Sequence, residues 1–275
     1  MDSDYIIFRI NTFEIMLYLN AYLKLNNFKR ENMFELSVLG LFVGLLSGFF
    51  GIGGGTILVP LLLILGYETK IAIGISVVQM VFSSIYGSYL NNKKGTLDIS
   101  MVLVIGVGGF IGALLSGYIA SYFNDRALEL LFLSFAIFAL LRLFFKTHEY
   151  REQKEVSRAA LLSIGVPLGA LSMTIGVGGS IILVPILVGF LHVPLKKAIS
   201  AGLFFVVFSS ISGLISHSLE GSVEYKSGII IGIASLVGVY IGIMLKDKVS
   251  AKVQKNLLVL FYLAVVLYLI QRIFI

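Results

Sequence analysis

The stretch GFFGIGGGTILVPLLLILG, residues 48–66, decides how the rest of the sequence is interpreted. It is almost entirely apolar, yet Gly51, Gly53, Gly54 and Gly55 crowd together in it and Pro60 follows. Glycine destabilises a helix interior by about 1 kcal/mol relative to alanine, and proline by about 3 kcal/mol. A segment that only had to cross a membrane as one helix would not carry this combination. The stretch therefore predicts a chain break between two short helices.

The same interruption returns in the second half of the chain, as IGVGGSIILVPILVGFL at residues 175–191. The offset between the two copies is 125 positions, from Pro60 to Pro185, and it also pairs Gly51, Gly53 and Gly54 with Gly176, Gly178 and Gly179. Further along, an offset of 126 pairs FSSI (82–85) with FSSI (208–211) and KGTLD (94–98) with EGSVE (220–224). Matches in a constant order indicate an internal duplication.

Composition places the chain in a membrane. Of its 275 residues, 58% are hydrophobic and 13% are charged, whereas a soluble domain usually carries about 25% charged residues. Charge-free runs such as 71–90, 99–123 and 198–216 are long enough to cross a hydrocarbon core of roughly 30 Å. We expect an all-α, multi-pass protein of the cell membrane. The net charge of +6 then reflects membrane topology rather than nucleic-acid binding.

Each half of the chain divides into five apolar segments. They cover 36–50, 55–66, 70–92, 97–123 and 127–145 in the first half, and 159–175, 180–191, 195–217, 226–245 and 253–274 in the second. The second segment of each half is too short to span the bilayer, so the first two segments predict a hairpin that turns inside the membrane. An odd number of segments inverts the second half relative to the first. This arrangement also gathers most Lys and Arg residues on one side, which becomes the cytoplasmic side.

This division gives four parts of the chain. They are an N-terminal amphipathic extension (1–34), membrane repeat 1 (35–145), a cytoplasmic linker (146–158) and membrane repeat 2 (159–275). Whether residues 5–23 span the membrane or lie at its surface is left open.

Short, glycine-broken segments at matching places in two halves are the best sequence pointer to a transporter's binding site. A helix that begins inside the membrane leaves its first N–H groups unpaired, and these groups suit an anion. A hydroxyl directly after the glycines can cap the helix or contact the ligand, and Gln79 is an amide within a long apolar span that needs a partner. The predicted substrate-binding residues are Gly51, Gly53, Gly54, Gly55, Thr56, Gln79, Ser83, Gly176, Gly178, Gly179, Ser180 and Ser209, with Pro60 and Pro185 as structural residues.

Each of these residues also has a structural interpretation. Glycines allow close helix packing in membranes, and we assign that role to Gly108 and Gly112. Gln79 suits interhelical hydrogen bonding as well as ligand contact, and the serines suit packing. At the positions matching Ser76 and Gln79, the second half has Gly202 and Phe205.

The chemistry that is missing narrows the function. The acidic residues lie in loops, at segment ends or in the N-terminal extension, and the chain has no cysteine. Neither a Ser-His-Asp set nor a metal-binding cluster can be assembled within the membrane. We therefore predict no enzyme activity, cofactor, metal or nucleic-acid partner.

The glycine motif with its downstream proline, followed by AIGISVVQMVFSSIYG (72–87) and a degenerate second copy, resembles the TauE/SafE sulfite exporter family, also called the 4-toluene sulfonate uptake permease family. The resemblance covers about residues 36–274 and implies a multi-spanning carrier for sulfite, sulfonates, related organosulfur compounds or small carboxylates. We expect a secondary carrier for a small anion that works by alternating access. An anion channel and a non-transporting scaffold subunit are the alternatives. The coupling ion, H⁺ or Na⁺, the direction of transport and the oligomeric state are left open.

Overall fold

The fold is known from a computed structural model, which describes all residues except 1–32, 96–98, 145–156, 247 and 275. The described residues form helices and no strand. The helices are α2 (Met33–Phe50), α3 (Gly55–Ile64), α4 (Thr69–Lys93), α5 (Ile99–Ala113), α6 (Ser116–Tyr122), α7 (Asp125–Phe144), α8 (Arg158–Thr174), α9 (Ser180–Gly189), α10 (Leu195–Leu219), α11 (Tyr225–Lys246) and α12 (Ala251–Phe274). Almost all of the predicted N-terminal extension (1–34) and linker (146–158) lies outside the described residues.

Nine of the ten expected segments correspond to one helix each, and the tenth contains two helices. The segment expected at 97–123 is broken into α5 and α6. At the break, the N–H of Leu115 donates to the carbonyl of Gly112 in a tight turn, and the N–H of Gly117 donates to Ser216 Oγ on α10. A hydroxyl from a distant helix therefore satisfies an N–H group at the start of α6 that has no partner within the helix.

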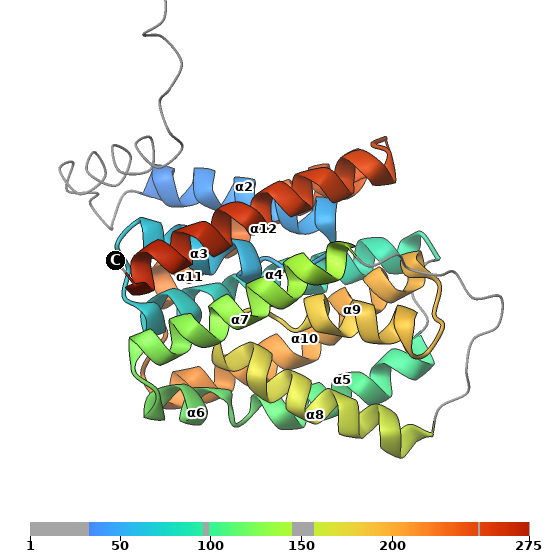
Figure 1. Cartoon of the computed structure of the whole chain (residues 1–275), viewed down its shortest axis with the longest axis horizontal. Coiled ribbons are helices and arrows are strands. Elements are labelled where there is room, and N and C mark those ends of the chain that lie inside the picture. Colours follow the sequence, from blue (N-terminus) through green and yellow to red (C-terminus); the bar gives the residue numbers. More distant parts are fainter. Residues whose placement is uncertain (1–32, 96–98, 145–156, 247, 275) are drawn as a thin grey trace, which may run out of the picture.

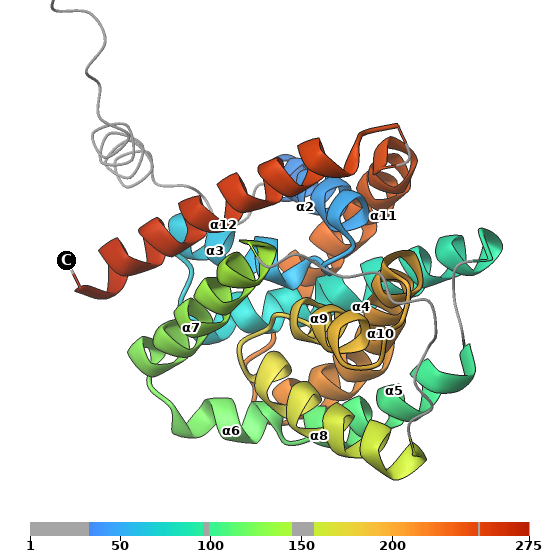
Figure 2. The ribbon, with the colours of Figure 1, turned by 45° about the vertical axis from the view of Figure 1, so that its right-hand side comes forward.

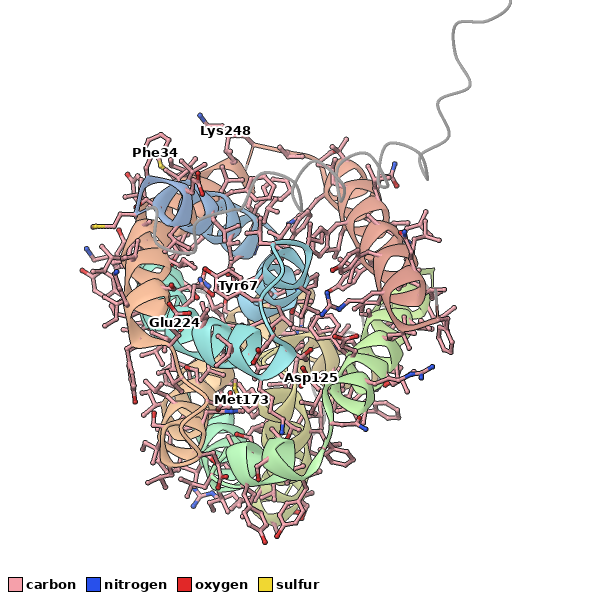
Figure 3. All side chains as sticks on the ribbon, turned by 90° about the vertical axis from the view of Figure 1, so that its left-hand side faces the viewer. Phe34, Tyr67, Asp125, Met173, Glu224 and Lys248 are labelled. Atoms are coloured by element: carbon pink, nitrogen blue, oxygen red, sulfur yellow. The ribbon has the colours of Figure 1, made fainter. Side chains whose placement is uncertain are left out.

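The molecule has the surface of a membrane protein. Six helical stretches are long and apolar enough to cross a membrane, and one of them, Val102–Tyr122, runs through the break between α5 and α6. The helices α3, α8 and α9 are shorter and apolar. Large apolar side chains such as Phe34, Leu260 and Phe274 point outward and are more than half exposed. Figure 3 shows that the outward-facing side chains around the helices are mostly carbon. Such a surface is stable against lipid and not against water.

The two longest helices, α4 and α10, form the centre. They pack on each other, α4 also contacts α3 and α11, and α10 also contacts α9 and α5. The most apolar stretches of α4 and α10 are 72% and 61% buried, against 28% for α12. In Figures 1 and 2, α2, α11 and α12 lie on one side of this centre and α5, α6 and α8 on the other.

Glycines hold the outer helices at very short distance. A methyl group added at Gly44 of α2 would lie 2.1 Å from the carbonyl oxygen of Ser235 on α11. At Gly112 of α5 it would lie 1.9 Å from the carbonyl oxygen of Val166 on α8. At Gly108 it would lie 2.6 Å from the carbonyl oxygen of Leu162 on α8, so the packing role predicted for Gly108 and Gly112 is confirmed. In both pairs the residue numbers rise together along the contact, so α2 runs parallel to α11 and α5 to α8.

The two pairs are copies of one contact. Gly40 approaches the carbonyl of Ile231, and the matching Gly165 approaches the carbonyl of Ile105. In each pair, the first helix of one half packs on the fourth helical segment of the other half. The exchange supports a two-fold relation between the halves, while their inversion across the bilayer stays a prediction.

Candidate functional site: two glycine turns

Two turns interrupt the hairpins at the centre of the molecule. The first turn, residues 51–54, joins α2 to α3, and the second turn, residues 175–179, joins α8 to α9. Every residue from 47 to 60 and from 172 to 181 is buried. Irregular backbone at this depth is tolerated only inside protein or beside a watery cavity.

The glycines of the turns serve two purposes. Gly53 and Gly178, which match each other, have φ angles of 76° and 82°, and Gly51 and Gly176 also lie in the left-handed region. Glycine is the residue that adopts this region without strain. Gly54 has an ordinary right-handed φ of −67°, so it is a glycine for reasons of space.

The helices that follow the turns begin without caps. The N–H groups of Gly54, Gly55 and Thr56 at the start of α3 donate no hydrogen bond within the described part of the chain. The same holds for Gly179, Ser180 and Ile181 at the start of α9. In contrast, Asn124 caps α7 and Ser157 caps α8. The bare N–H groups expected from the sequence are therefore present, in duplicate and deeply buried.

One interpretation of the sequence was that the hydroxyl groups beside the turns cap their own helices. In the structure they donate to the other turn instead. Thr56 Oγ1 donates to the carbonyl of Val177 at 3.3 Å, and Ser180 Oγ donates to the carbonyl of Ile52 at 2.5 Å. Ser76 of α4 adds a third bond, at 2.9 Å, to the carbonyl of Gly176. Each turn is thus held by a hydroxyl that belongs to the other half. Carbonyls exposed by the left-handed glycines accept these bonds, which leaves the N–H groups free.

Gln79 lies directly against the first turn. Its side chain is fully buried, and neither Oε1 nor Nε2 has a hydrogen-bond partner. A methyl group at Gly54 would lie 1.9 Å from Oε1, so the amide sits against the N-cap residue of α3. A buried amide without partners is unfavourable by about 1–3 kcal/mol, and such groups in native structures call for an explanation.

The matching position on the second turn is apolar. Phe205 lies against Gly179 as Gln79 lies against Gly54. Between the turns, Met80 of α4 approaches Gly55 and Gly178, and its counterpart Val206 of α10 approaches Gly53 and Gly178. The central pair of helices therefore presents an amide to one turn and a phenyl ring to the other.

The hydroxyls of the two remaining serines donate hydrogen bonds within their own helices. Ser83 Oγ donates to the carbonyl of Met80 and Ser209 Oγ to that of Phe205, both one turn earlier on the same helix. Pro60 and Pro185 lie inside α3 and α9, which continue through them. The structure thus brings both glycine clusters, Thr56, Ser180 and Gln79 together, and it shows no contact of the two serines with the turns.

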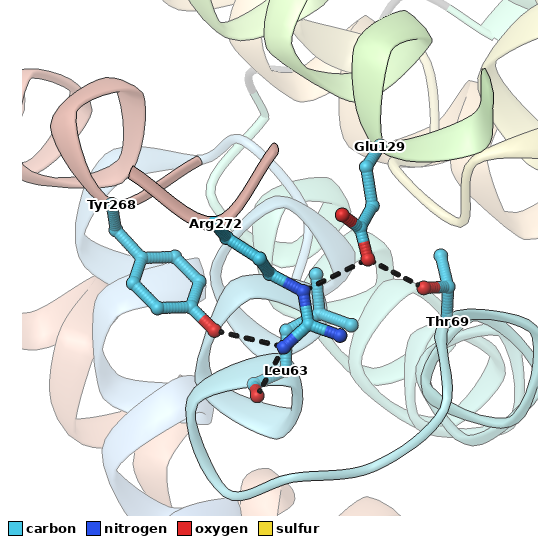
Figure 4. Close-up of polar contacts among 5 residues, drawn as sticks. All are labelled: Leu63, Thr69, Glu129, Tyr268 and Arg272. Carbon is cyan, nitrogen blue, oxygen red and sulfur yellow. Dashed lines mark hydrogen bonds and ion pairs between the residues drawn. The ribbon is translucent and has the colours of Figure 1, made fainter. Parts of the chain in front are cut away.

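A second polar cluster was not anticipated from the sequence. Glu129 of α7 is 6% exposed, and its Oε1 accepts from Arg272 Nε at 2.9 Å and from Thr69 Oγ1 at 2.8 Å. Arg272 also donates to the carbonyl of Leu63 and to Tyr268. Figure 4 shows that the cluster joins α12, α7, the end of α3 and the start of α4. The sequence shows only charges at segment ends, and 143 positions separate the two partners.

His217 joins the end of α10 to the end of α8. It is 1% exposed, its Nε2 lies 3.0 Å from the carbonyl of Met173 and its Nδ1 lies 3.2 Å from Ser222 Oγ. Met173 lies two residues before the second turn, so this contact ties the end of α8, where the chain enters the turn, to α10. No three His, Asp or Glu side chains converge on a metal-sized site in the part of the chain that the structure describes.

Comparison with known proteins agrees with this architecture. Residues 36–269 match the family described as "Sulfite exporter TauE/SafE". The "Probable membrane transporter protein YunE" of Bacillus subtilis (strain 168) is 26% identical over 256 residues, which cover 82% of this chain and 91% of the relative. YdhB of the same organism, also named a probable membrane transporter protein, is 28% identical over 212 residues, covering 73% of this chain and 84% of the relative. MJ0441 of Methanocaldococcus jannaschii, with the same description, is 29% identical over 236 residues and covers 79% and 87%.

No solved structure matches the chain. The family match spans most of the chain, and its relatives are named as transporters. Together with the six apolar helices, this makes the protein a multi-pass membrane transporter. The chain belongs to the TauE/SafE sulfite exporter family.

Proposed function

We propose that the protein is a secondary carrier for a small anion, of the sulfite, sulfonate or related organosulfur class, that binds at the two glycine turns. The observation that carries the proposal is the pair of buried, uncapped helix starts, together with the unpartnered amide of Gln79 beside the first of them. Bare N–H groups at a helix N-terminus carry partial positive charge and attract an anion. The amide of Gln79, which lies against Gly54, adds two side-chain N–H donors.

The contacts between the turns suggest how binding would be coupled to movement. The hydroxyls of Thr56 and Ser76 donate to carbonyls of the second turn, and the hydroxyl of Ser180 donates to a carbonyl of the first turn. An anion entering between the turns would compete for these hydroxyl donors. Exchange of the hydroxyls between carbonyl and anion would loosen one half against the other, as alternating access between inverted repeats requires.

Purified protein in liposomes tests the proposal. We expect saturable uptake of sulfite or methanesulfonate, with a rate that depends on a proton or sodium gradient. Empty liposomes and liposomes that hold heat-inactivated protein are the controls. Flux that rises linearly with concentration and ignores every gradient would indicate an anion channel. Absence of flux, together with absence of any anion-dependent rise in melting temperature, would indicate a scaffold and overturn the proposal.

A further inference from the structure

We propose that the site selects anions with a single negative charge and that Gln79 is the side chain that contacts them. This inference rests on the carrier function proposed above and adds the charge class of the substrate. It follows from what surrounds the turns and from what is missing there.

In the part of the chain that the structure describes, no Lys or Arg side chain is among the nearest neighbours of the turn glycines. The atoms nearest to the seven turn glycines, 51, 53–55, 176, 178 and 179, belong to Gln79, serines, apolar side chains and the backbone. Among the described residues, Glu129 is the charged side chain that is buried, and it is already paired with Arg272. An anion at the turns therefore meets neutral donors only.

The positive charge available from these donors amounts to about one elementary charge. Each helix N-terminus carries roughly half a positive charge, and two of them, those of α3 and α9, reach the turns. The two partial charges together about balance the single negative charge of a monoanion that lies between them. A dianion would keep about one negative charge without compensation at a buried place. Because the Born cost of a buried ion grows with the square of its charge, the second charge is disproportionately unfavourable.

Gln79 fits this electrostatic balance. A neutral amide adds two N–H donors without adding charge. The donors are buried and unpartnered, and they lie against Gly54 at the start of α3. The matching Phe205 on the other helix has no donor. The anion is therefore expected to sit nearer to the first turn than to the second.

Matched pairs of anions test the charge class directly. Uptake into proteoliposomes is compared for methanesulfonate against methanedisulfonate, and for acetate against malonate, at a pH where all acid groups are ionised. We expect the monoanion of the transported pair to have an apparent affinity higher by about tenfold or more. Equal uptake of mono- and dianion would overturn the charge class and leave the carrier function standing. Failure of all four anions and of sulfite to move or to bind would overturn the carrier function as well.

Gln79→Met and Gln79→Glu test the contact. The methionine variant keeps the size and loses the donors, so we expect KM for the monoanion to rise by about tenfold at an unchanged maximal rate. The glutamate variant adds a negative charge and should raise KM further. The melting temperature of each purified variant separates a lost contact from a lost fold. An unchanged KM in a folded Gln79→Met protein would show that Gln79 does not contact the anion. The charge preference is tested separately, on the native protein with the paired anions.

Discussion

At the scale of single residues, the contact between Gly54 and Gln79 is the most informative one. Gly54 has a right-handed φ of −67°, which alanine also adopts. A methyl group there would nevertheless lie 1.9 Å from Oε1 of Gln79. A substitution at this position therefore displaces the amide without straining the backbone.

We predict that Gly54→Ala raises the KM for the transported anion by about tenfold, equivalent to ~1.4 kcal/mol of binding free energy. Gly54 is the N-cap of α3, where alanine is less favourable than glycine, so the melting temperature of the purified variant is measured beside KM to separate a displaced amide from a lost fold. Uptake kinetics in proteoliposomes measure the effect. Gly189→Ala at the end of α9 is the control, since a methyl group there meets nothing closer than Arg142 Nη2 at 3.7 Å. Equal KM values in both variants would contradict the assigned position of Gln79.

At the scale of helices, the sequence predicts what local pattern determines. The hairpin breaks follow from glycine next to proline, and the lengths of α3 and α9 follow from the next turn signals. The break between α5 and α6 was not predicted, and the hydroxyl that accepts a hydrogen bond beside it, that of Ser216, lies on α10. The pairing of Glu129 with Arg272 was not predicted either. When the partner of a residue lies about a hundred or more positions away, the local sequence around that residue gives no sign of the contact.

The Glu129–Arg272 pair yields a prediction for the packing of the last helix. Removing one partner leaves the other charge inside the protein, so we expect Arg272→Met to destabilise the fold by about 2–3 kcal/mol. The value lies below that for a fully buried pair because the Arg272 side chain is 32% exposed. The double variant with Glu129→Gln should be more stable than Arg272→Met alone.

Thermal or denaturant unfolding in detergent, analysed as a double-mutant cycle, measures this coupling. Additive effects of the two substitutions would show that the ion pair does not hold α12 on α7. Lys255→Met, at the other end of α12, serves as the control for loss of a positive charge from the same helix.

At the scale of the whole molecule, duplication explains why so much of the site could be predicted. Gly54 and Gly179 hold matching places, and so do Met80 and Val206. Residues that match by a constant offset in the sequence therefore make equivalent contacts at the centre of the molecule. The sequence cannot say which hydroxyl bonds which carbonyl. Thr56 and Ser180 bond matching carbonyls, Val177 and Ile52, from positions that do not match.

The inversion of the halves across the bilayer can be measured on two matching residues. Lys94 directly follows α4 and Glu220 directly follows α10, and both side chains are exposed. Inverted halves place the two residues on opposite sides of the membrane, with Lys94 in the cytoplasm. Halves in the same orientation would place both residues on one side.

The chain has no cysteine, so Lys94→Cys and Glu220→Cys each create a single thiol. We expect a membrane-impermeant maleimide, added to intact cells, to label the thiol at 220 and to leave the thiol at 94 unmodified until the cells are opened. Lys248→Cys, in the short connection between α11 and α12, should behave like the variant at 94. Labelling of 94 and 220 from the same side would show parallel halves. The second half would then run in the wrong direction for the two uncapped helix starts to converge from opposite sides on one anion, and the reason for placing the binding site between them would be lost.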